Sequence, residues 1–438
     1  MSNNDMPSPT TQASTPVRLA LALLHPSAAV IPIDGPMLVG RSTDCDVVLE
    51  TTSASRAHAR LCPTPSGVEI IDLHSRNGIF LDGRRIVGRA TVHGGVLRMG
   101  DSVAVVTSIR ASIAGARELA TPLIGGASLD ELRMAASAIG RGDRSVHLVG
   151  EPGTGKQLVA RWLHELGGRS GPFVSVNCAA LPLHVVETEL LGRADNREMG
   201  IPERQGLIAA AARGTLFLDA IGELPIDAQR ALLRVLECER SADARFRLVT
   251  ATNVDLSPAI ESGRFDRDLA DHIRAAELRL PALRDRLEDL TELSSHLIER
   301  SSAAVRLLPD VVEVLARHHW SQNIRELDQV LRSCVSNRRS DVTLADLPPR
   351  MQLGFRLAPI RATPSDYSAE ITHARVDEVL REHHGNVRRV SATLGIARTR
   401  LYRLMEKWSV DPNQYRRSEA ASTPHDQVHR LDAPHARS

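Results

Sequence analysis

The sequence lacks the features that mark disulfide-stapled, zinc-knuckle and membrane-spanning proteins. Its five cysteines in 438 residues are scattered and without C-x-x-C pairing, which argues against a disulfide framework. No run approaches the ~20 apolar residues that a membrane span needs. The start, MSNNDMPSPTTQASTP, lacks the charge and apolar core of a signal peptide. We therefore expect a cytoplasmic protein without a membrane partner.

Excess charge of either sign is lacking too. The net charge is +1, from 54 basic and 53 acidic residues, so nucleic acid can be bound only by a local basic patch. The histidines at 318–319 and 383–384 are adjacent and lack the i, i+4 spacing that places two metal ligands on one helix face. With 42% hydrophobic and 24% charged residues, the composition is that of an ordinary soluble protein. The length predicts about three domains.

A phosphate-binding pattern, G-x-x-x-x-G-K, is present in GEPGTGKQ at 150–157. An apolar run at 145–149 that predicts a buried strand precedes it, and apolar residues at helical spacing follow at 158–166. Glycines at such a strand-to-helix turn let backbone N–H groups and the helix N-terminus face an anion. We therefore expect a nucleotide here, with Lys156 at its outer phosphates. The expected binding residues are Gly150, Glu151, Gly153, Thr154, Gly155, Lys156 and Gln157.

Around this loop the pattern of strands and helices predicts a multidomain chain. Short strands separated by turn residues, including Asp82-Gly83, predict an N-terminal all-β sandwich. Alternating strands and helices predict a central α/β domain with a parallel sheet, which Ser128 and Glu131 open with a capping box. The predicted parts are a disordered start (1–16), the sandwich (17–110), a linker (111–127), the α/β domain (128–350, with a helical lid from about 282), a second linker (351–365), an all-α helix-turn-helix (366–412) and a disordered tail (413–438).

Polar residues of the predicted sandwich gather in three of its loops. Arg41 and Arg56 could grip an anion bidentately while the Ser55 hydroxyl donates to it, which is chemistry suited to a phosphate ester. Asn77 could hold a peptide backbone. The alternative is that these are turn residues and solvated arginines.

The elements GR, S-R-x-H and S-R-N-G, in this order and spacing, resemble a forkhead-associated (FHA) domain, a phosphothreonine-peptide reader. The resemblance implies that Arg41 and Ser55 bind the phosphate and that Asn77 binds the peptide backbone, with Arg56 beside them. It also implies a phosphothreonine-containing partner linked to a Ser/Thr kinase. Ile79 stands where the family often has Thr. The residues that would shape the loops are Gly40, His58 and Gly78.

The central region contains five landmarks, GEPGTGK, VNCAALP (176–182), GTLFLDAIGELP (214–225), ATN (251–253) and WSQNIREL (320–327). Together they resemble the AAA+ domain of bacterial enhancer-binding regulators, which use ATP to remodel the sigma-54 form of RNA polymerase. By this resemblance the cofactors are ATP and Mg²⁺, and Asp219 binds the Mg²⁺ or its water. Asn253 would sense the γ-phosphate, and Arg325 would be the second sensor.

Three functional groups of that family are replaced in this sequence. Ala220 stands where the family has a Glu that polarises the attacking water and that Asn177 would hold. The arginines that reach a neighbour's ATP fall on Asp266 and His272, and Arg267 is one place off, a shift of about 100° around a helix. The sigma-54 loop GAFTGA reads NREMGI at 196–201. We predict weak or absent ATP hydrolysis and no sigma-54 contact.

The segment GNVRRVSATLGIARTRLYRLMEKW, at 385–408, resembles the Fis-type DNA-binding end of the same regulators. Its last two predicted helices carry a local basic patch, for which the alternative is a solvated helix face. Residues 398–400 lie at the start of the recognition helix, where base edges are reached. The expected DNA-binding residues are Arg388, Arg398, Thr399, Arg400, Tyr402 and Arg403.

Two functions remain open at this point. The chain is either a fully active ATP-driven activator of sigma-54 promoters, with RNA polymerase as a partner, or a DNA-binding transcriptional regulator that binds ATP without efficient turnover. We favour the second, with input from a phosphothreonine partner and a homo-oligomer, a dimer, on DNA. A phosphopeptide adaptor with a vestigial C-terminus is a third interpretation, and the basic recognition helix counts against it.

Overall fold

The protein divides into two compact units, Met1–Ile86 with Val92–Ala358, and Val87–Thr91 with Pro359–Ser438. The computed structural model describes residues 17–181, 185–193, 204–238, 245–301, 305–335, 341–356, 373–383, 385–387, 390, 398–408, 410–412 and 414–415. The predicted disordered start, the NREMGI loop and nearly all of the predicted tail lie outside the described residues.

The first domain is a β-sandwich, as predicted. Its strands are β1 (Val17–His25), β2 (Ala29–Pro32), β3 (Met37–Gly40), β4 (Val47–Val48), β5 (Ala59–Thr64), β6 (Gly67–Asp72), β7 (Ile79–Leu81), β8 (Arg84–Ile86), β9 (Arg89–Val92), β10 (Gly95–Met99) and β11 (Ser102–Arg110). One sheet has the order β2-β1-β11-β10-β7-β8, and β4, β3, β5 and β6 are neighbours in the other. Asp82 and Gly83 have φ of 48° and 78°, as a tight hairpin turn of the primed type requires, so this predicted hairpin is confirmed.

The second domain is built on a parallel sheet with the strand order β13-β16-β17-β12-β18. Its elements, with η for 3₁₀ helices, are η1 (Ala127–Leu129), α1 (Asp130–Gly140), β12 (Val146–Val149), α2 (Lys156–Leu166), β13 (Phe173–Asn177), η2 (Cys178–Ala180), α3 (Val186–Leu191), β14 (Gly192–Arg193), β15 (Arg204–Gln205), α4 (Leu207–Ala210), β16 (Thr215–Asp219), η4 (Ile221–Glu223), α5 (Ile226–Glu237), β17 (Arg247–Thr252), α6 (Ser257–Glu261), α7 (Arg267–Ile273) and β18 (Glu277–Arg279).

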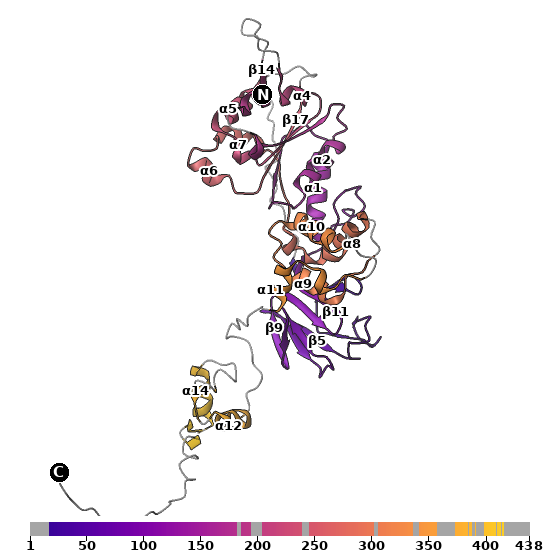
Figure 1. The fold of residues 1–438 in the computed structure, drawn as a ribbon, viewed down its shortest axis with the longest axis vertical. Helices are drawn as coiled ribbons and strands as arrows, with labels where there is room; N and C mark the ends of the chain where they lie inside the picture. The colour runs from indigo at the N-terminus through magenta and orange to yellow at the C-terminus, as the bar shows by residue number, and fades with distance from the viewer. Residues whose placement is uncertain are drawn as a thin grey trace, which may run out of the picture. The chain divides into compact units, whose positions relative to one another are not determined.

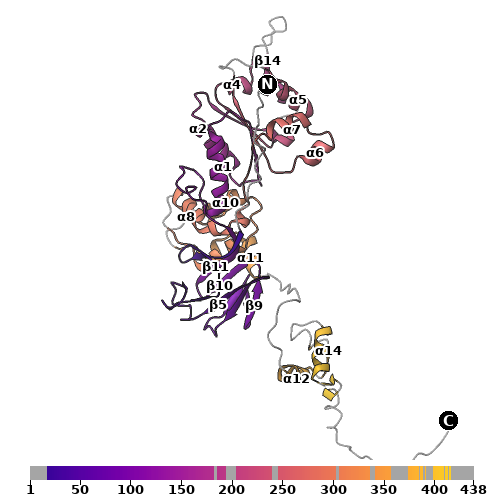
Figure 2. The ribbon, with the colours of Figure 1, turned by 180° about the vertical axis from the view of Figure 1, so that it is seen from behind.

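Successive side chains of the central strands point to opposite faces of this sheet, so the domain has two apolar cores, one on each face. On β16, Leu216 and Leu218 belong to the cluster that includes residues of α3, α5 and α7, whereas Phe217 belongs to the cluster with residues of α1 and α2. Figure 1 shows α5 and α7 on one side of β17 and α1 and α2 on the other, and Figure 2 shows the same arrangement from behind. Buried on both faces, these strands are apolar runs, as parallel strands usually are.

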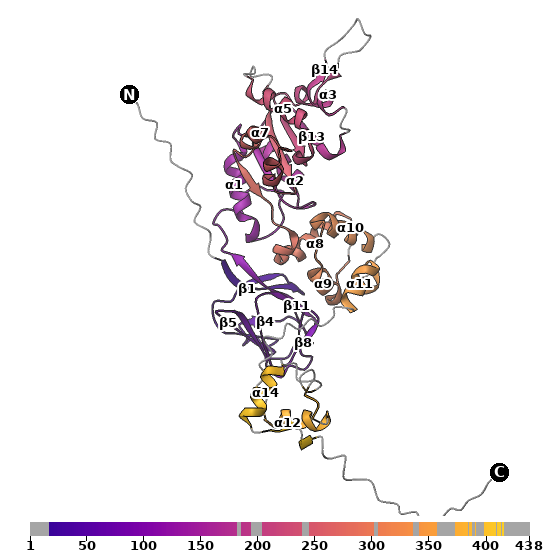
Figure 3. The same cartoon turned by 90° about the vertical axis from the view of Figure 1, so that its left-hand side faces the viewer.

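The lid is helical and packs against the β-sandwich. Its elements are η6 (Leu283–Asp285), η7 (Leu287–Asp289), α8 (Leu290–Arg300), α9 (Pro309–Arg317), α10 (Asn323–Val335), η8 (Leu344–Asp346) and α11 (Pro349–Arg356). One apolar cluster joins Val311, Trp320 and other lid residues to Leu24 and Val105 of the sandwich. Figure 3 shows α8 and α9 beside β1 and β11. The lid and the sandwich therefore share one core.

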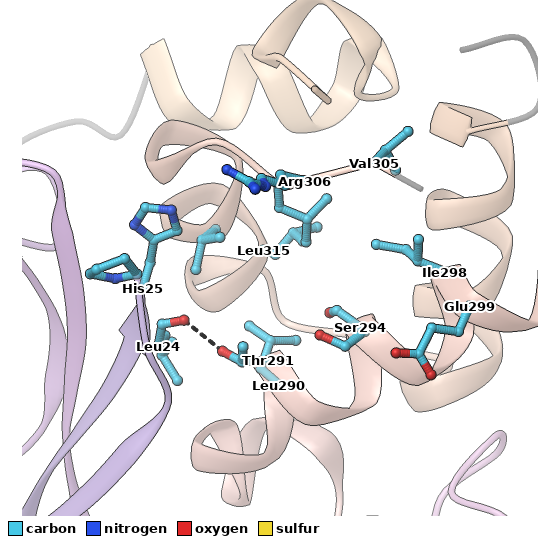
Figure 4. Close-up of a pocket in the computed structure, with 14 residues that line it drawn as sticks. Leu24, His25, Leu290, Thr291, Ser294, Ile298, Glu299, Val305, Arg306 and Leu315 are labelled. Atoms are coloured by element: carbon cyan, nitrogen blue, oxygen red, sulfur yellow. Dashed lines mark hydrogen bonds between the residues drawn. The ribbon is translucent and has the colours of Figure 1, made fainter. Parts of the chain in front are cut away.

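A polar contact reinforces this junction. The Thr291 hydroxyl, on α8, donates to the Leu24 carbonyl oxygen at 2.8 Å (Figure 4). A cavity of about 400 Å³ lies beside the contact, between α8, α9 and the end of β1.

Two sequence predictions need correction. Ser128 does not cap α1: Leu129 occupies the N-cap, and the Ser128 hydroxyl donates to Asp289 Oδ2 at 3.1 Å. Helix α11 continues through Arg356, so the linker predicted from residue 351 begins later. By contrast, the segment predicted as a linker at 111–127 has no helix or strand before η1, although the Trp162 indole binds its Ala120 carbonyl.

The smaller unit contains α12 (His373–Glu382) and α14 (Arg398–Lys407). Val376, Val379 and Leu380 of α12 pack in one apolar cluster with Leu401 and Met405 of α14. Of the segment between α12 and α14, residues 383, 385–387 and 390 are described. Within the described part of the chain, each helix is too short or too polar to cross a lipid bilayer, and three or more metal-ligating side chains do not gather.

Arg247 is fully buried in the α/β domain, where it ties β17 to the end of α1. Its Nη1 and Nη2 donate to the carbonyl oxygens of Gly140 and Ile139 at 2.6 and 2.8 Å. Burial lowers the pKa of Arg247 to about 10, so the guanidinium stays charged at neutral pH. A cation at a helix C-terminus satisfies carbonyls that lack an intrahelical donor.

We therefore expect Arg247→Met to lower the free energy of unfolding by about 3 kcal/mol, because it removes the buried, charge-assisted hydrogen bonds that the guanidinium donates. Urea unfolding followed by circular dichroism measures this loss. Arg230→Met is the matched control, since the Arg230 side chain on α5 is 62% exposed, and it should change the free energy by less than about 0.5 kcal/mol. Equal losses in the two variants would contradict this role for Arg247.

Candidate phosphopeptide and nucleotide sites

The loop after β3 and the loop before β5 are held together by backbone contacts. The Arg41 N–H donates to the Ser55 carbonyl at 2.9 Å, and the Ser42 N–H donates to the Arg56 carbonyl at 3.0 Å. Gly40 permits this approach, because a Cβ there would sit 2.2 Å from the Arg56 carbonyl oxygen. The structure thus brings the predicted phosphate ligands Arg41 and Ser55 side by side.

His58 joins these loops to the third one. Its Nδ1 accepts the Ser55 N–H at 3.0 Å, so Nε2 must carry the proton that binds the Gly78 carbonyl at 3.2 Å. Complete burial lowers the pKa of His58, which favours this neutral tautomer. Gly78, at φ of 75°, adopts the left-handed conformation that glycine tolerates best. The predicted loop-shaping roles of His58 and Gly78 therefore have a structural basis.

Ser55 and Asn77 complete the meeting of the three loops. The Ser55 hydroxyl accepts the Arg76 N–H at 2.9 Å, which leaves its own hydrogen able to donate to a ligand. The Asn77 amide donates to the Ser53 carbonyl at 2.7 Å. Arg56 is exposed on the same surface loop. Ile79, the departure from the family pattern, is completely buried and so belongs to the core.

The P-loop connects β12 to α2 in the way that the sequence predicts. Gly155, at φ of 104°, is the N-cap of α2, which begins at Lys156. The Lys156 ammonium donates to the Gly150 and Glu151 carbonyls at 2.7 and 3.0 Å. Burial chiefly, and then the charge of Arg325, lowers the pKa of Lys156, while Asp219 opposes the shift. The predicted charged residues Asp219, Arg325 and Glu151 therefore all interact electrostatically with Lys156.

Asp219 ends β16, and Ala220 follows it without a carboxylate. Asp219 Oδ1 accepts the Ala220 N–H at 3.0 Å, and Ala220 has a φ of 53°. On the neighbouring strand Asn177 lies in register with Asp219, and its Oδ1 accepts the Ala179 N–H at 3.1 Å. Asn177 therefore caps η2 in this protein. Asn253 follows the carboxyl end of β17 and is exposed.

Glu151 connects the P-loop to the lid. Its carboxylate makes a bidentate pair with Arg284 and accepts the Asn323 amide at 3.1 Å. These bonds lower the pKa of Glu151 to about 2. Asn323 also donates to the Pro152 carbonyl at 3.0 Å and accepts the Leu283 N–H at 2.7 Å. Sequence reasoning missed Arg284 and Asn323 as parts of the site, although Asn323 lies within the WSQNIREL landmark.

The lid segment around Asn323 also packs closely against the P-loop backbone. A Cβ on Gly153 would sit 2.0 Å from the Gln322 carbonyl oxygen, and the Ile324 N–H donates to the Gly153 carbonyl at 3.1 Å. Gly153 is thus required by the lid as well as by its φ of 77°. Arg325 follows directly, which explains why its charge reaches Lys156.

An apolar cavity of about 380 Å³ opens beside Thr154 and Gly155. Leu123 and Ile124 from the segment before α1, Leu280 after β18 and Leu293 on α8 help to line it. Its position next to the phosphate loop and its apolar lining suit a nucleobase. No periodic pattern in the sequence marks this pocket, because its walls come from several segments that are distant in sequence.

The residues at the predicted arginine-finger positions have other surroundings. Asp266 is the N-cap of α7: its Oδ1 accepts the Leu269 N–H at 3.0 Å, and its own N–H donates to Gln229 Oε1 at 2.8 Å. Arg267 and His272 are exposed on α7. The predicted sigma-54 loop at 196–201 lies outside the described residues.

The predicted DNA-binding residues fall mostly on α14. Residues 398–400 form its first turn, and Tyr402 and Arg403 follow, with Tyr402 exposed. Arg388 lies outside the described residues.

Three family models match successive parts of this chain. They are the FHA domain over residues 37–101, the sigma-54 interaction domain over 124–279 and the AAA+ ATPase lid domain over 284–355. The regulatory protein AtoC of Escherichia coli is 36% identical over 61% of this chain and 63% of AtoC, so the chain spans less than two thirds of that relative. The response regulator protein PilR of Pseudomonas aeruginosa is 33% identical over 64% of this chain and 68% of PilR.

Among solved structures, NtrX from Brucella abortus in complex with ATP is 26% identical, with a TM-score of 0.47, over 65% of this chain and 69% of the NtrX chain. From the family models and the relatives, the chain belongs to the sigma-54-dependent transcriptional regulators and carries an FHA domain ahead of its sigma-54 interaction domain.

Proposed function

We propose that the protein is a DNA-binding transcriptional regulator that binds ATP, hydrolyses it poorly and receives its input from a phosphothreonine-containing protein. The observation that carries this proposal is the pairing of the P-loop with Ala220, which cannot activate water, directly after Asp219. The FHA domain supplies the phosphothreonine input, and the C-terminal unit supplies DNA binding as a dimer.

ATP binding is supported by the P-loop, the Lys156 ammonium and the adjoining apolar cavity. The expected ligands remain those of the sequence analysis, from Gly150 to Gln157, with Asn253 and Arg325 as sensors. Mg²⁺ prefers carboxylate, water and phosphate oxygens, and Asp219 offers a carboxylate whose charge is felt at Lys156. Asp219 would hold the ion through water, and the bound ion would neutralise phosphate charge.

Poor hydrolysis follows from two separate deficits. A general base or water-positioning group typically contributes 10²- to 10⁴-fold, and Ala220 has no group for this task. An arginine finger contributes about 10³-fold or more by stabilising charge on the transferring phosphoryl group. Asp266 and His272 occupy the finger positions, and Asp266 caps a helix. The two deficits act at different points of one transition state.

The alternative function is a fully active ATP-driven activator of sigma-54 promoters. Membership of the family and the match to the sigma-54 interaction domain favour it. NREMGI at 196–201 opposes it, because Glu and Met replace the aromatic and hydroxyl residues of the family loop. Direct activation of a sigma-54 promoter by the purified protein would establish this alternative.

We predict that Arg41→Ala reduces the affinity for phosphothreonine peptides about 100-fold or more, because it removes a bidentate partner of a doubly charged ester. Fluorescence anisotropy with matched phosphorylated and unphosphorylated peptide libraries measures the loss. Arg60→Ala removes an exposed arginine from β5 of the same domain and should leave the affinity unchanged. Equal affinity of the wild type for both libraries contradicts the phosphothreonine input.

For hydrolysis we expect Ala220→Glu alone to leave turnover far below the 1 to 10³ per second of typical enzymes, because the finger deficit of roughly 4 kcal/mol remains. Adding Asp266→Arg and His272→Arg should raise turnover further, although losing the Asp266 cap costs about 1 kcal/mol of stability. Steady-state phosphate release measures all variants, with Ala220→Gln as the control for side-chain size. Full rescue by Ala220→Glu would show that Arg267, or another arginine, is the finger.

For DNA binding we predict that Arg400→Ala weakens specific binding by about 1 to 3 kcal/mol, because Arg400 lies in the first turn of α14, where a recognition helix reads base edges. Gel shifts on a selected two-fold symmetric site and on random DNA make the comparison. An equal loss on both DNAs would mean that Arg400 contacts only phosphate.

A further inference from the structure

A cavity of about 400 Å³, the junction cavity, lies where the FHA domain meets the lid. Leu24 and His25 at the end of β1 form one wall, and α8, α9 and the segment before α9 form the others (Figure 4). Its volume lies within the range of small-molecule pockets, about 300 to 1,000 Å³. Because residues of both domains line it, a ligand there contacts the FHA domain and the lid together.

Helix α8 separates the junction cavity from the apolar cavity beside the P-loop. The junction cavity is lined by residues 290, 291, 294, 295, 298 and 299 of α8, and the cavity beside the P-loop by residues 293, 296, 297 and 300. At about 100° per residue, these two sets lie on opposite faces of the helix. The junction cavity is therefore distinct from the place where we expect the nucleobase.

The walls of the junction cavity are mainly apolar. Ile298, Val312 and Leu315 line it from α8 and α9, and they are buried in the core that the lid shares with the sandwich. Leu24 adds an apolar side chain from the sandwich. Such walls favour an apolar ligand, because contact with them removes its surface from water.

Ser294 adds an unsatisfied hydroxyl to this apolar lining. The residue is 2% exposed, and its Oγ has no hydrogen-bond partner within the described part of the chain. Two other polar groups of the lining are already bonded: the Thr291 hydroxyl donates to the Leu24 carbonyl, and His25 Nδ1 donates to the Asp101 carbonyl at 3.0 Å. A buried hydroxyl without a partner costs free energy, which an oxygen atom of a ligand can recover.

The charged side chains of the lining are opposite in sign. Glu299, on α8, and Arg306, before α9, line the junction cavity, and both are exposed (Figure 4). A charged ligand would be attracted by one of them and repelled by the other, and water and salt screen both interactions. The lining therefore favours a ligand without net charge.

We propose that the junction cavity binds an uncharged, largely apolar small molecule that carries one hydrogen-bonding oxygen, such as an aromatic alcohol. Its apolar body packs against Ile298, Val312 and Leu315, and its oxygen pairs with the Ser294 hydroxyl. This site goes beyond the proposed function, because it takes neither a phosphopeptide nor a nucleotide. It exists only while the FHA domain and the lid are packed together, since both supply its walls.

The test uses the full-length protein and the probes 1-naphthol, naphthalene and 1-naphthoate. Naphthalene lacks the oxygen, and 1-naphthoate carries a negative charge. Saturation-transfer NMR titrations measure the affinities. The wild type should bind 1-naphthol about fivefold more tightly than naphthalene, which is the gain from one net hydrogen bond, and should bind 1-naphthoate more weakly than 1-naphthol.

Ser294→Ala should remove the fivefold preference and leave the affinity for naphthalene unchanged, because it deletes the hydroxyl and keeps the apolar walls. Ser301→Ala is the matched control: Ser301 follows α8, its hydroxyl donates to the Leu297 carbonyl at 3.2 Å, and it lies outside the lining. This variant should keep the preference. Val312→Phe fills the cavity and should weaken both uncharged probes about tenfold or more. Circular dichroism shows whether each variant is folded.

Equal affinities of the wild type for 1-naphthol and naphthalene overturn the proposal, as does tighter binding of 1-naphthoate or no binding of either uncharged probe. A preference for 1-naphthol that survives Ser294→Ala overturns the role of the hydroxyl. Displacement of 1-naphthol by Mg-ATP, together with unchanged affinity in Val312→Phe, places the probe in the cavity beside the P-loop and also contradicts the proposal.

Discussion

The contact between Asn323 and Glu151 fixes the lid on the P-loop, and much of the remaining architecture depends on it. Asn323 is fully buried, with a φ of 51°, in the left-handed region that asparagine adopts more readily than most residues other than glycine. Its amide satisfies Glu151, the Pro152 carbonyl and the Leu283 N–H at once. Because α10 starts at this residue, the contact also sets where Arg325 stands relative to Lys156.

The contact is stable across the neutral pH range. The pKa of Glu151 falls from 4.5 to about 2, because the Arg284 and Asn323 bonds favour the carboxylate. A depressed carboxylate pKa stabilises the fold fully above the ordinary value and loses that contribution as the pH falls toward the lowered one. The lid anchor should therefore weaken only in acid, between about pH 5 and pH 2.

The sequence predicted those parts of the protein that depend on neighbouring residues. The P-loop, the Asp82-Gly83 hairpin and the three FHA loops are each encoded within a few positions, so turn chemistry and spacing were sufficient to find them. The Ser128 capping box failed because Asp289, distant in sequence, accepts the Ser128 hydroxyl. Local pattern cannot register such a competitor.

Contacts between distant segments could not be predicted either, because local patterns do not show which distant segments pack together. Arg98 contacts Asp310 and Glu313 only once the sandwich and lid have packed together. In the sequence, nothing distinguishes the buried Arg247 from an ordinary polar residue within an apolar strand. The FHA domain and the lid consequently share one apolar core, which the sequence motifs of the two domains do not predict. The role of Asp266 as a helix cap, by contrast, could be predicted locally, since an Asp directly before a helix is a typical N-cap.

We propose that the nucleotide site retains ATP without consuming it. The most direct measurement is a single-turnover experiment, in which radiolabelled Mg-ATP is mixed with excess full-length protein, retained on a filter and identified by chromatography over time. We expect the retained nucleotide to be still ATP after several minutes. Retained nucleotide converted to ADP within seconds, or no retention at all, would contradict it.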